Sequence, residues 1–130
     1  MGVNIDELNG PTLAYLGDAV LELMVRELLI CDGSGNVGKY NRDAAKYVKA
    51  TSQSAAFEKI SDILSEDEEY AYKHGRNAHG ISAPKSASTV DYRRATGFEA
   101  LFGYLYLSGK KDRMYELFRI AFSEEGKVNE

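Results

Sequence analysis

Apolar residues recur at steps of three and four along most of the chain, and this period is typical of helices that bury one face. The clearest case is PTLAYLGDAVLELMVREL, residues 11–28. Its apolar positions form one stripe: Leu13, Leu16, Val20, Leu21, Met24 and Leu28. No segment shows the convincing alternation of apolar and polar residues that indicates a half-buried strand. The sequence therefore predicts an all-α fold.

Turn formers and capping residues divide the chain into helices. The first begins near Asn9-Gly10, with Pro11 in its first turn, and ends before the turn-rich CDGSGN. The other helices are expected at 37–49, 51–64, 65–74, 91–111 and 113–122. The helix from 91 should bury a stripe made of Phe98, Leu101, Phe102, Leu105 and Tyr106. A chain of 130 residues then forms a single domain, residues 1–130.

Two helix starts and one loop can be predicted from local sequence. Ser65 and Glu68 fit a capping box, and Thr51 or Ser52 is expected to cap the preceding helix. Residues 75–88 form a long basic loop that contains glycines and other small residues. Loops of this length in a compact domain are usually functional or disordered.

The composition excludes several classes of protein. With 44% hydrophobic and 28% charged residues, the whole chain is not intrinsically disordered. No run approaches the roughly 20 apolar residues of a membrane span, and the N-terminus lacks the pattern of a secretory signal. The only cysteine, Cys31, excludes an internal disulfide and a cysteine-based metal cage. A cytoplasmic protein without a membrane partner is expected.

Two acidic residues lie within strongly apolar helices: Asp18 in YLGDAVLEL and Glu99 in TGFEALFGYLYL. Each has a glycine close by, Gly17 and Gly97, which would let two helices pack closely. If the helices cross there, the two carboxylates could meet and hold a hard cation such as Mg²⁺. The alternative from periodicity alone is two ordinary surface acids.

Positive charge is concentrated in one segment although the net charge is −4. Residues 70–94 carry five Lys or Arg and two His against one acid, whereas residues 58–69 carry six acids against one lysine. The acidic run is interpreted as a solvated helix start. The basic segment suits contact with a phosphate backbone, although such a loop can also be an inert surface. His74 and His79 flank this loop and lack metal-ligand spacing, so loop polarity explains them.

Two of these motifs resemble a known family. YLGDAVLEL looks like the signature helix of ribonuclease III catalytic domains, TGFEALFGYLYLSG resembles their second conserved helix, and GRNA stands between them as expected. The resemblance covers essentially the whole chain. A catalytic domain without a separate double-stranded-RNA-binding domain is expected, which is similar to the Mini-ribonuclease III group of the family.

The resemblance implies a homodimeric, all-helical endonuclease that hydrolyses double-stranded RNA. Asp18 and Glu99 match the family's catalytic, metal-binding carboxylates, with Mg²⁺ as the cofactor and Mn²⁺ as an alternative ion. Tyr15 matches an aromatic position at the dimer interface. Larger relatives carry further carboxylates where this chain has Pro11, Ala14 and Thr96. The implied substrate is a stem of the 23S ribosomal RNA precursor, with a ribosomal protein as a further partner.

The loop would supply the grip that the missing RNA-binding domain does not. The expected RNA contacts are Lys73, Arg76, Asn77, His79, Lys85, Arg93 and Arg94. An alternative function is a catalytically silent dimer that binds structured RNA or a ribosomal partner. Retention of Asp18 and Glu99 argues against it, because a scaffold needs neither carboxylate. A third alternative is a helical nucleotide hydrolase that uses the acidic run EDEE, residues 66–69. The sequence offers no second acidic helix to match this run, which argues against it.

Overall fold

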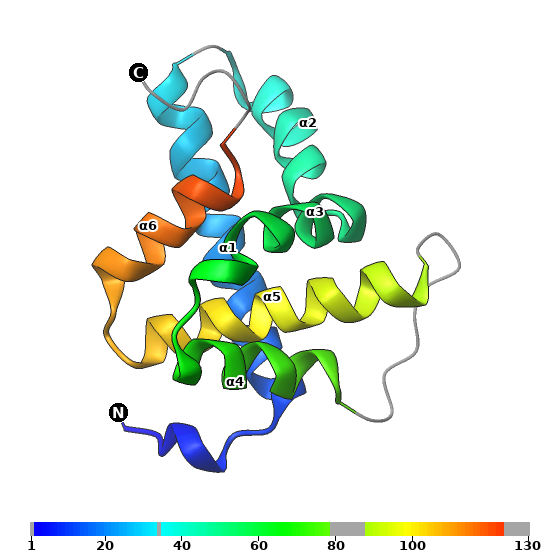
Figure 1. Ribbon diagram of the computed structural model, residues 1–130. Coiled ribbons are helices and arrows are strands. Elements are labelled where there is room, and N and C mark those ends of the chain that lie inside the picture. Colours follow the sequence, from blue (N-terminus) through cyan, green and yellow to red (C-terminus); the bar gives the residue numbers. More distant parts are fainter. Residues whose placement is uncertain (1, 34, 79–87, 124–130) are drawn as a thin grey trace.

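The computed structural model describes residues 2–33, 35–78 and 88–123, and these residues contain helices but no strand (Figure 1). The all-α prediction is thus confirmed over the described chain. Two short 3-10 helices, η1 (Ile5–Glu7) and η2 (Ser61–Ile63), precede α1 and α4. The α-helices are α1 (Gly10–Asp32), α2 (Val37–Val48), α3 (Ala50–Ile60), α4 (Glu66–Arg76), α5 (Thr89–Leu107) and α6 (Lys111–Ala121).

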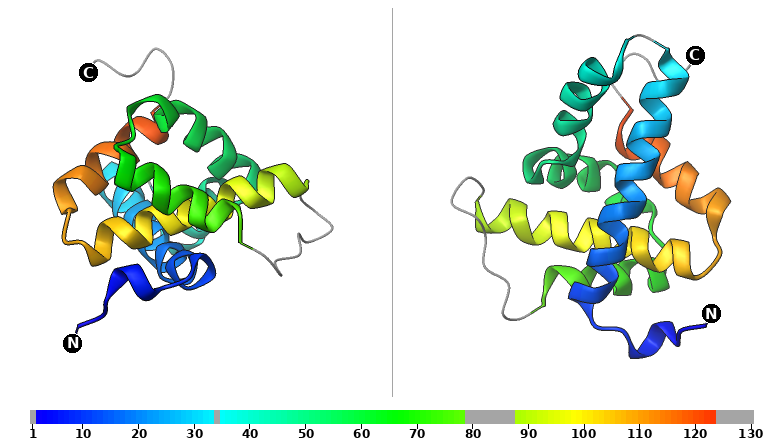
Figure 2. Two further views of the ribbon diagram at one scale, coloured as in Figure 1. Left: turned by 60° about the horizontal axis from the view of Figure 1, so that its bottom comes forward. Right: turned by 180° about the vertical axis from the view of Figure 1, so that it is seen from behind.

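The centre of the fold is the crossing of α1 and α5 (Figure 2). Glycines let the two backbones touch there. A Cβ atom at position 17 would lie 1.6 Å from the carbonyl oxygen of Glu99, and one at position 103 would lie 2.1 Å from the carbonyl oxygen of Leu13. Neither position can hold a larger residue unless the helices move apart.

The core forms around α5, from which Phe98, Leu101, Phe102 and Leu105 are fully buried. They pack with apolar residues of the other helices, among them Leu21, Val25, Ile60 and Leu117. Two predicted core positions are wrong, because Tyr106 is 45% exposed and Leu28 is 40% exposed. Leu29 is buried in place of Leu28, and of the two neighbours Leu105 and Tyr106 only Leu105 points inward, because successive residues on a helix are rotated by about 100°.

Side-chain caps start several of the helices. Asn9, Asn36 and Ser88 each accept a hydrogen bond from a backbone N–H in the first turn of α1, α2 and α5. The predicted capping box of α4 is confirmed. The predicted Thr51 or Ser52 cap is wrong: α3 begins at Ala50, and the Ser52 hydroxyl donates to the carbonyl oxygen of Lys46. Helix α4 also continues to Arg76, further than expected.

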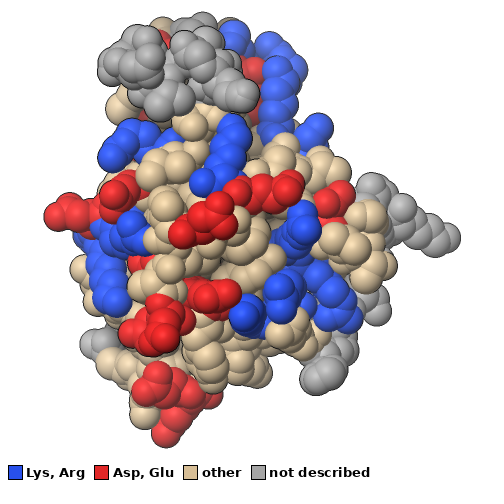
Figure 3. All heavy atoms as spheres, in the orientation of Figure 1, with Lys and Arg blue, Asp and Glu red and all other residues tan. Residues whose placement is uncertain are grey.

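Figure 3 shows a cluster of positive charge on one part of this face, while Lys, Arg, Asp and Glu are mixed elsewhere on it. Lys and Arg gather over the N-terminal half of α5 and the adjoining end of α4, whereas Asp and Glu gather near the start of α4. The described helices include none that is both long and apolar enough to cross a membrane.

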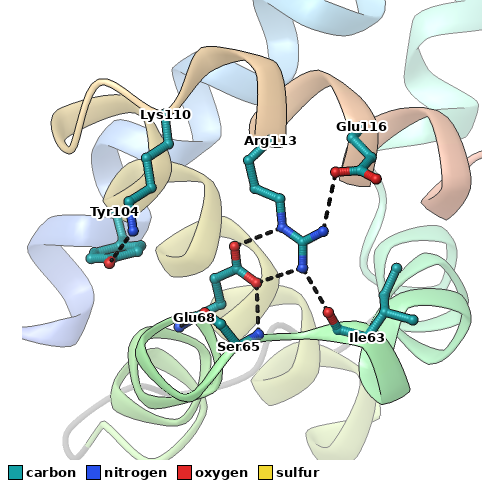
Figure 4. Close-up of polar contacts among 7 residues, drawn as sticks. All are labelled: Ile63, Ser65, Glu68, Tyr104, Lys110, Arg113 and Glu116. Carbon is teal, nitrogen blue, oxygen red and sulfur yellow. Dashed lines mark hydrogen bonds and ion pairs between the residues drawn. The ribbon is translucent and has the colours of Figure 1, made fainter.

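One member of the acidic run is buried rather than solvated, which corrects the prediction for Glu68. Glu68 is 3% exposed, and its carboxylate accepts hydrogen bonds at 2.8 Å from both Nε and Nη2 of Arg113 in α6 (Figure 4). It also accepts from the N–H of Ser65 at 2.8 Å, while Arg113 donates to the carbonyl oxygen of Ile63. The Arg113 hydrogen bonds lower the pKa of Glu68. This network ties α6 to η2 and the start of α4.

Candidate functional site

The crossing of α1 and α5 brings Asp18 and Glu99 together. The backbone of Glu99 touches Gly17, the residue before Asp18, and the carboxyl group of Glu99 lies within hydrogen-bonding reach of Asp18. Asp18 is exposed, and Glu99 is half-buried. Of the two alternatives left open by periodicity, a pair of neighbouring carboxylates is the one found.

The two carboxyl groups perturb each other. Burial raises the pKa of Glu99, and the negative charge of Asp18 and its hydrogen bond raise it further, to about 8. Two carboxylates at close range cannot both ionise easily unless a cation joins them. With a pKa of about 8, the carboxyl group of Glu99 is mostly protonated at neutral pH when no cation is bound.

The donor set suits a hard divalent cation, since Mg²⁺ prefers carboxylate oxygens and keeps several water ligands. None of the ion pairs found in the described residues joins Asp18 or Glu99 to a basic side chain. Within that same part of the chain, no group of three or more Asp, Glu, His or Cys is arranged to hold a metal. Of the three substituted positions, Pro11 and Ala14 have no polar side-chain atom, and Thr96 donates its hydroxyl to the carbonyl oxygen of Tyr92. A cation here would be held by two protein carboxylates, with water and substrate supplying its other ligands.

Several of the predicted RNA contacts lie on the positive surface at the end of α4 and the start of α5 (Figure 3). Lys73 pairs with Glu69 at 3.2 Å, and Arg94 lies 3.8 Å from Glu58. These pairs are exposed and contribute little stability, so phosphates can compete for the cations.

Arg76 and Asn77 form a connected pair at the end of α4. The Nε of Arg76 donates to the side-chain oxygen of Asn77 at 3.0 Å, and the guanidinium lies 5.5 Å from the centre of the Tyr72 ring. The cation–π contact and the hydrogen bond hold the charge of Arg76 at the surface.

Arg93 has a structural partner that the sequence did not indicate. From α5 its Nη1 donates to the carbonyl oxygens of Arg76 at 3.2 Å and Ala78 at 3.3 Å. The positive charge of Arg93 at these carbonyls interacts favourably with the negative, C-terminal end of the α4 dipole. Two other predicted contacts, His79 and Lys85, lie outside the described residues.

A groove of about 570 Å³ lies between the start of α1 and the outer face of α4, and sequence analysis missed it. It is lined by Asn9, Gly10, Pro11, Tyr70, Lys73, His74, Asn77 and Ala78. His74 is part of α4 and stacks on Tyr70, with ring centres 5.6 Å apart, so its assignment to the edge of a loop is wrong. The spacing of positions 70, 73, 74 and 77, which share one helical face, was the available signal.

Comparisons with known proteins agree on one family. A family model described as Ribonuclease III domain matches residues 11–110. The chain is 47% identical to Mini-ribonuclease 3 of Symbiobacterium thermophilum over 88% of this chain and 90% of that one, and 40% identical to Mini-ribonuclease 3 of Enterococcus faecalis over 95% and 96%. A crystal structure of a protein from Fusobacterium nucleatum superposes with a TM-score of 0.79 at 31% identity, covering 88% of this chain and 91% of that one.

Proposed function

The chain belongs to the ribonuclease III family, and we propose that it is a Mg²⁺-dependent endoribonuclease that cuts double-stranded RNA. Its catalytic residues would be Asp18 and Glu99. The observation that carries the proposal is the carboxylate pair at the crossing of α1 and α5. The similarity to Mini-ribonuclease 3 proteins extends over nearly the whole chain, including both helices that supply the pair.

Asp18 and Glu99 would hold the cation. When bound, Mg²⁺ lowers the pKa of a coordinated water and neutralises charge that builds on the phosphate. The protein's contribution is to keep the two carboxylates close and correctly oriented. Glu99 must release its proton when it becomes a ligand, because its pKa lies near 8 in the metal-free pair. Half-burial of Glu99 and the tight packing at Gly17 restrict its movement.

The working unit would be a homodimer with Tyr15 at its interface. Tyr15 is 84% exposed although it lies in the long central helix, and a second copy would bury its ring. Two active sites, one for each strand, could then face the wide minor groove of an A-form duplex. Phosphates around each site would be contacted by the seven expected RNA-binding residues, which are Lys73, Arg76, Asn77, His79, Lys85, Arg93 and Arg94.

The proposed substrate is the paired stem of the 23S ribosomal RNA precursor, with a ribosomal protein as an additional partner and the cytoplasm as the site of action. The alternative is a catalytically silent dimer that binds structured RNA. This alternative does not explain why two carboxylates that repel each other are kept close together.

Cleavage of an end-labelled RNA stem in Mg²⁺ tests the proposal, with Asp18→Asn and Glu99→Gln as the variants. We expect the wild type to cut both strands and each variant to lose at least about 100-fold in rate while it still binds the stem. Circular dichroism confirms that the variants are folded. Absence of cutting by the wild type, or wild-type rates in both variants, would refute the metal-site assignment.

A further inference from the structure

The groove between α1 and α4 combines an exposed aromatic surface with a cation and an amide. Tyr70 is 70% exposed, and its ring is nearly parallel to that of His74, with an angle of 17° between the planes. Lys73 lies on the same face of α4, and Asn77 follows one turn after it. The side-chain oxygen of Asn77 accepts from Arg76, and its amide NH₂ group can donate to the edge of a base.

The groove lies at the start of α1, on the side of this helix that carries Asp18 further along. Pro11 lines the groove, and Asp18 follows seven residues later, which is two helical turns and therefore the same side of the helix. The rise of an α-helix separates the two positions by about 10 Å. The backbones of α1 and α4 touch at the groove, where a Cβ at Gly10 would lie 2.1 Å from the carbonyl oxygen of His74.

An RNA strand at the carboxylate pair would therefore pass close to the groove. The volume of about 570 Å³ is sufficient for one nucleotide, but a base inside a duplex is already stacked and paired. An unpaired base can leave the helix and stack on an aromatic side chain without the cost of breaking a base pair. Stacking depends on the face of the base and tolerates any sequence, whereas the ammonium of Lys73 suits the adjoining phosphate.

We propose that the groove binds one unpaired nucleotide of the substrate, its base stacked on the Tyr70–His74 pair and its phosphate on Lys73. The inference rests on the proposed function, since it places the groove beside the cleaved strand. The protein then selects stems in which a bulged or terminal nucleotide lies at a fixed distance from the cleaved bond. The groove thus adds selection by secondary structure to recognition of the duplex.

The test compares two RNA stems that differ only in one nucleotide. In one stem 2-aminopurine, a purine whose fluorescence falls when it stacks, is a single-nucleotide bulge, and its position is moved along the strand. In the other stem it is paired. Binding is measured in EDTA, so that the RNA remains intact, by anisotropy of an end label and by 2-aminopurine emission.

We expect the bulged stem to bind about tenfold more tightly than the paired stem at one bulge position, the range expected for one stacked base, with quenched emission at that position. Tyr70→Ala should remove the preference and the quenching. Tyr70→Phe, the matched control, keeps the ring and should retain both. Because Tyr70 is mostly exposed, neither change should unfold the chain.

Equal affinity for the two stems at every bulge position, or an unchanged preference in Tyr70→Ala, would overturn the inference. Cleavage of the paired stem in Mg²⁺ separates this failure from failure of the proposed function. If the paired stem is cut and the groove shows no preference, the nuclease assignment remains and the groove has no such role.

Discussion

Replacing Arg113 by methionine should destabilise the protein strongly, because it leaves a buried charge without its partner. Glu68 is 3% exposed, and Arg113 supplies two of its hydrogen bonds at 2.8 Å. Methionine fills a similar volume but has no donor. Removing one partner of a buried pair costs about 3–5 kcal/mol. The Arg113 side chain is 28% exposed, and the N–H of Ser65 continues to serve Glu68, so about 3 kcal/mol is expected.

The double variant Glu68→Leu/Arg113→Met separates the buried charge from simple loss of contacts. Apolar replacement of a whole buried pair is often neutral or stabilising, so the double variant should be more stable than Arg113→Met alone. Urea unfolding followed by circular dichroism at one protein concentration measures both free energies of unfolding.

The destabilisation should also depend on pH. The folded state lowers the pKa of Glu68 below its ordinary value of 4.5, so the pair's stabilisation is present above that value. It is lost as pH falls through the folded pKa. The gap between wild type and Arg113→Met should therefore narrow from pH 7 to pH 4 and below. An equal urea midpoint for the two proteins at pH 7, or a gap that widens in acid, would refute this account of Glu68.

Three further experiments test the helix crossing, the carboxylate pair and the positive surface. Gly17→Ala should lower the free energy of unfolding by about 3 kcal/mol or more, because its Cβ would lie 1.6 Å from a backbone oxygen. The control Gly38→Ala has a nearest contact of 3.4 Å and should change the free energy of unfolding by less than about 1 kcal/mol. Equal urea midpoints for the two variants would contradict the close packing at Gly17. Binding of Mn²⁺ or Mg²⁺ should release close to one proton below pH 8, because the pKa of Glu99 is about 8 and the ligand must be ionised, so affinity should rise with pH between 6 and 8. Calorimetry in two buffers of different ionisation enthalpy measures the release, and a pH-independent affinity would exclude it. Arg76→Ala should reduce the slope of log affinity against log salt for duplex RNA by about 1, and Lys111→Ala, at the far end of the fold, should leave it unchanged.

Features specified within one helical turn could be predicted from the sequence. Ser65 and Glu68 are three residues apart, and both hydrogen bonds of their capping box form, at 2.8 and 3.2 Å. The burial of Glu68 could not be predicted in this way, because its partner Arg113 follows 45 residues later. The Thr51 or Ser52 cap failed for a related reason: a single residue, Lys49, separates α3 from α2, and the Ser52 hydroxyl donates back to the carbonyl oxygen of Lys46 across that junction.

The carboxylate pair depends both on a local sequence feature, Gly17-Asp18, and on the packing of two distant helices. Gly17 and Asp18 stand together in a helix that would otherwise favour better helix formers, and this cost indicated a special position. The same glycine that weakens the helix brings the backbone of Glu99 into contact, so packing and the site depend on one feature. Any larger residue at position 17 would separate the helices and the carboxylates together. The function of the pair is therefore better tested by Asp18→Asn and Glu99→Gln, which preserve the crossing, than by changes to the glycine.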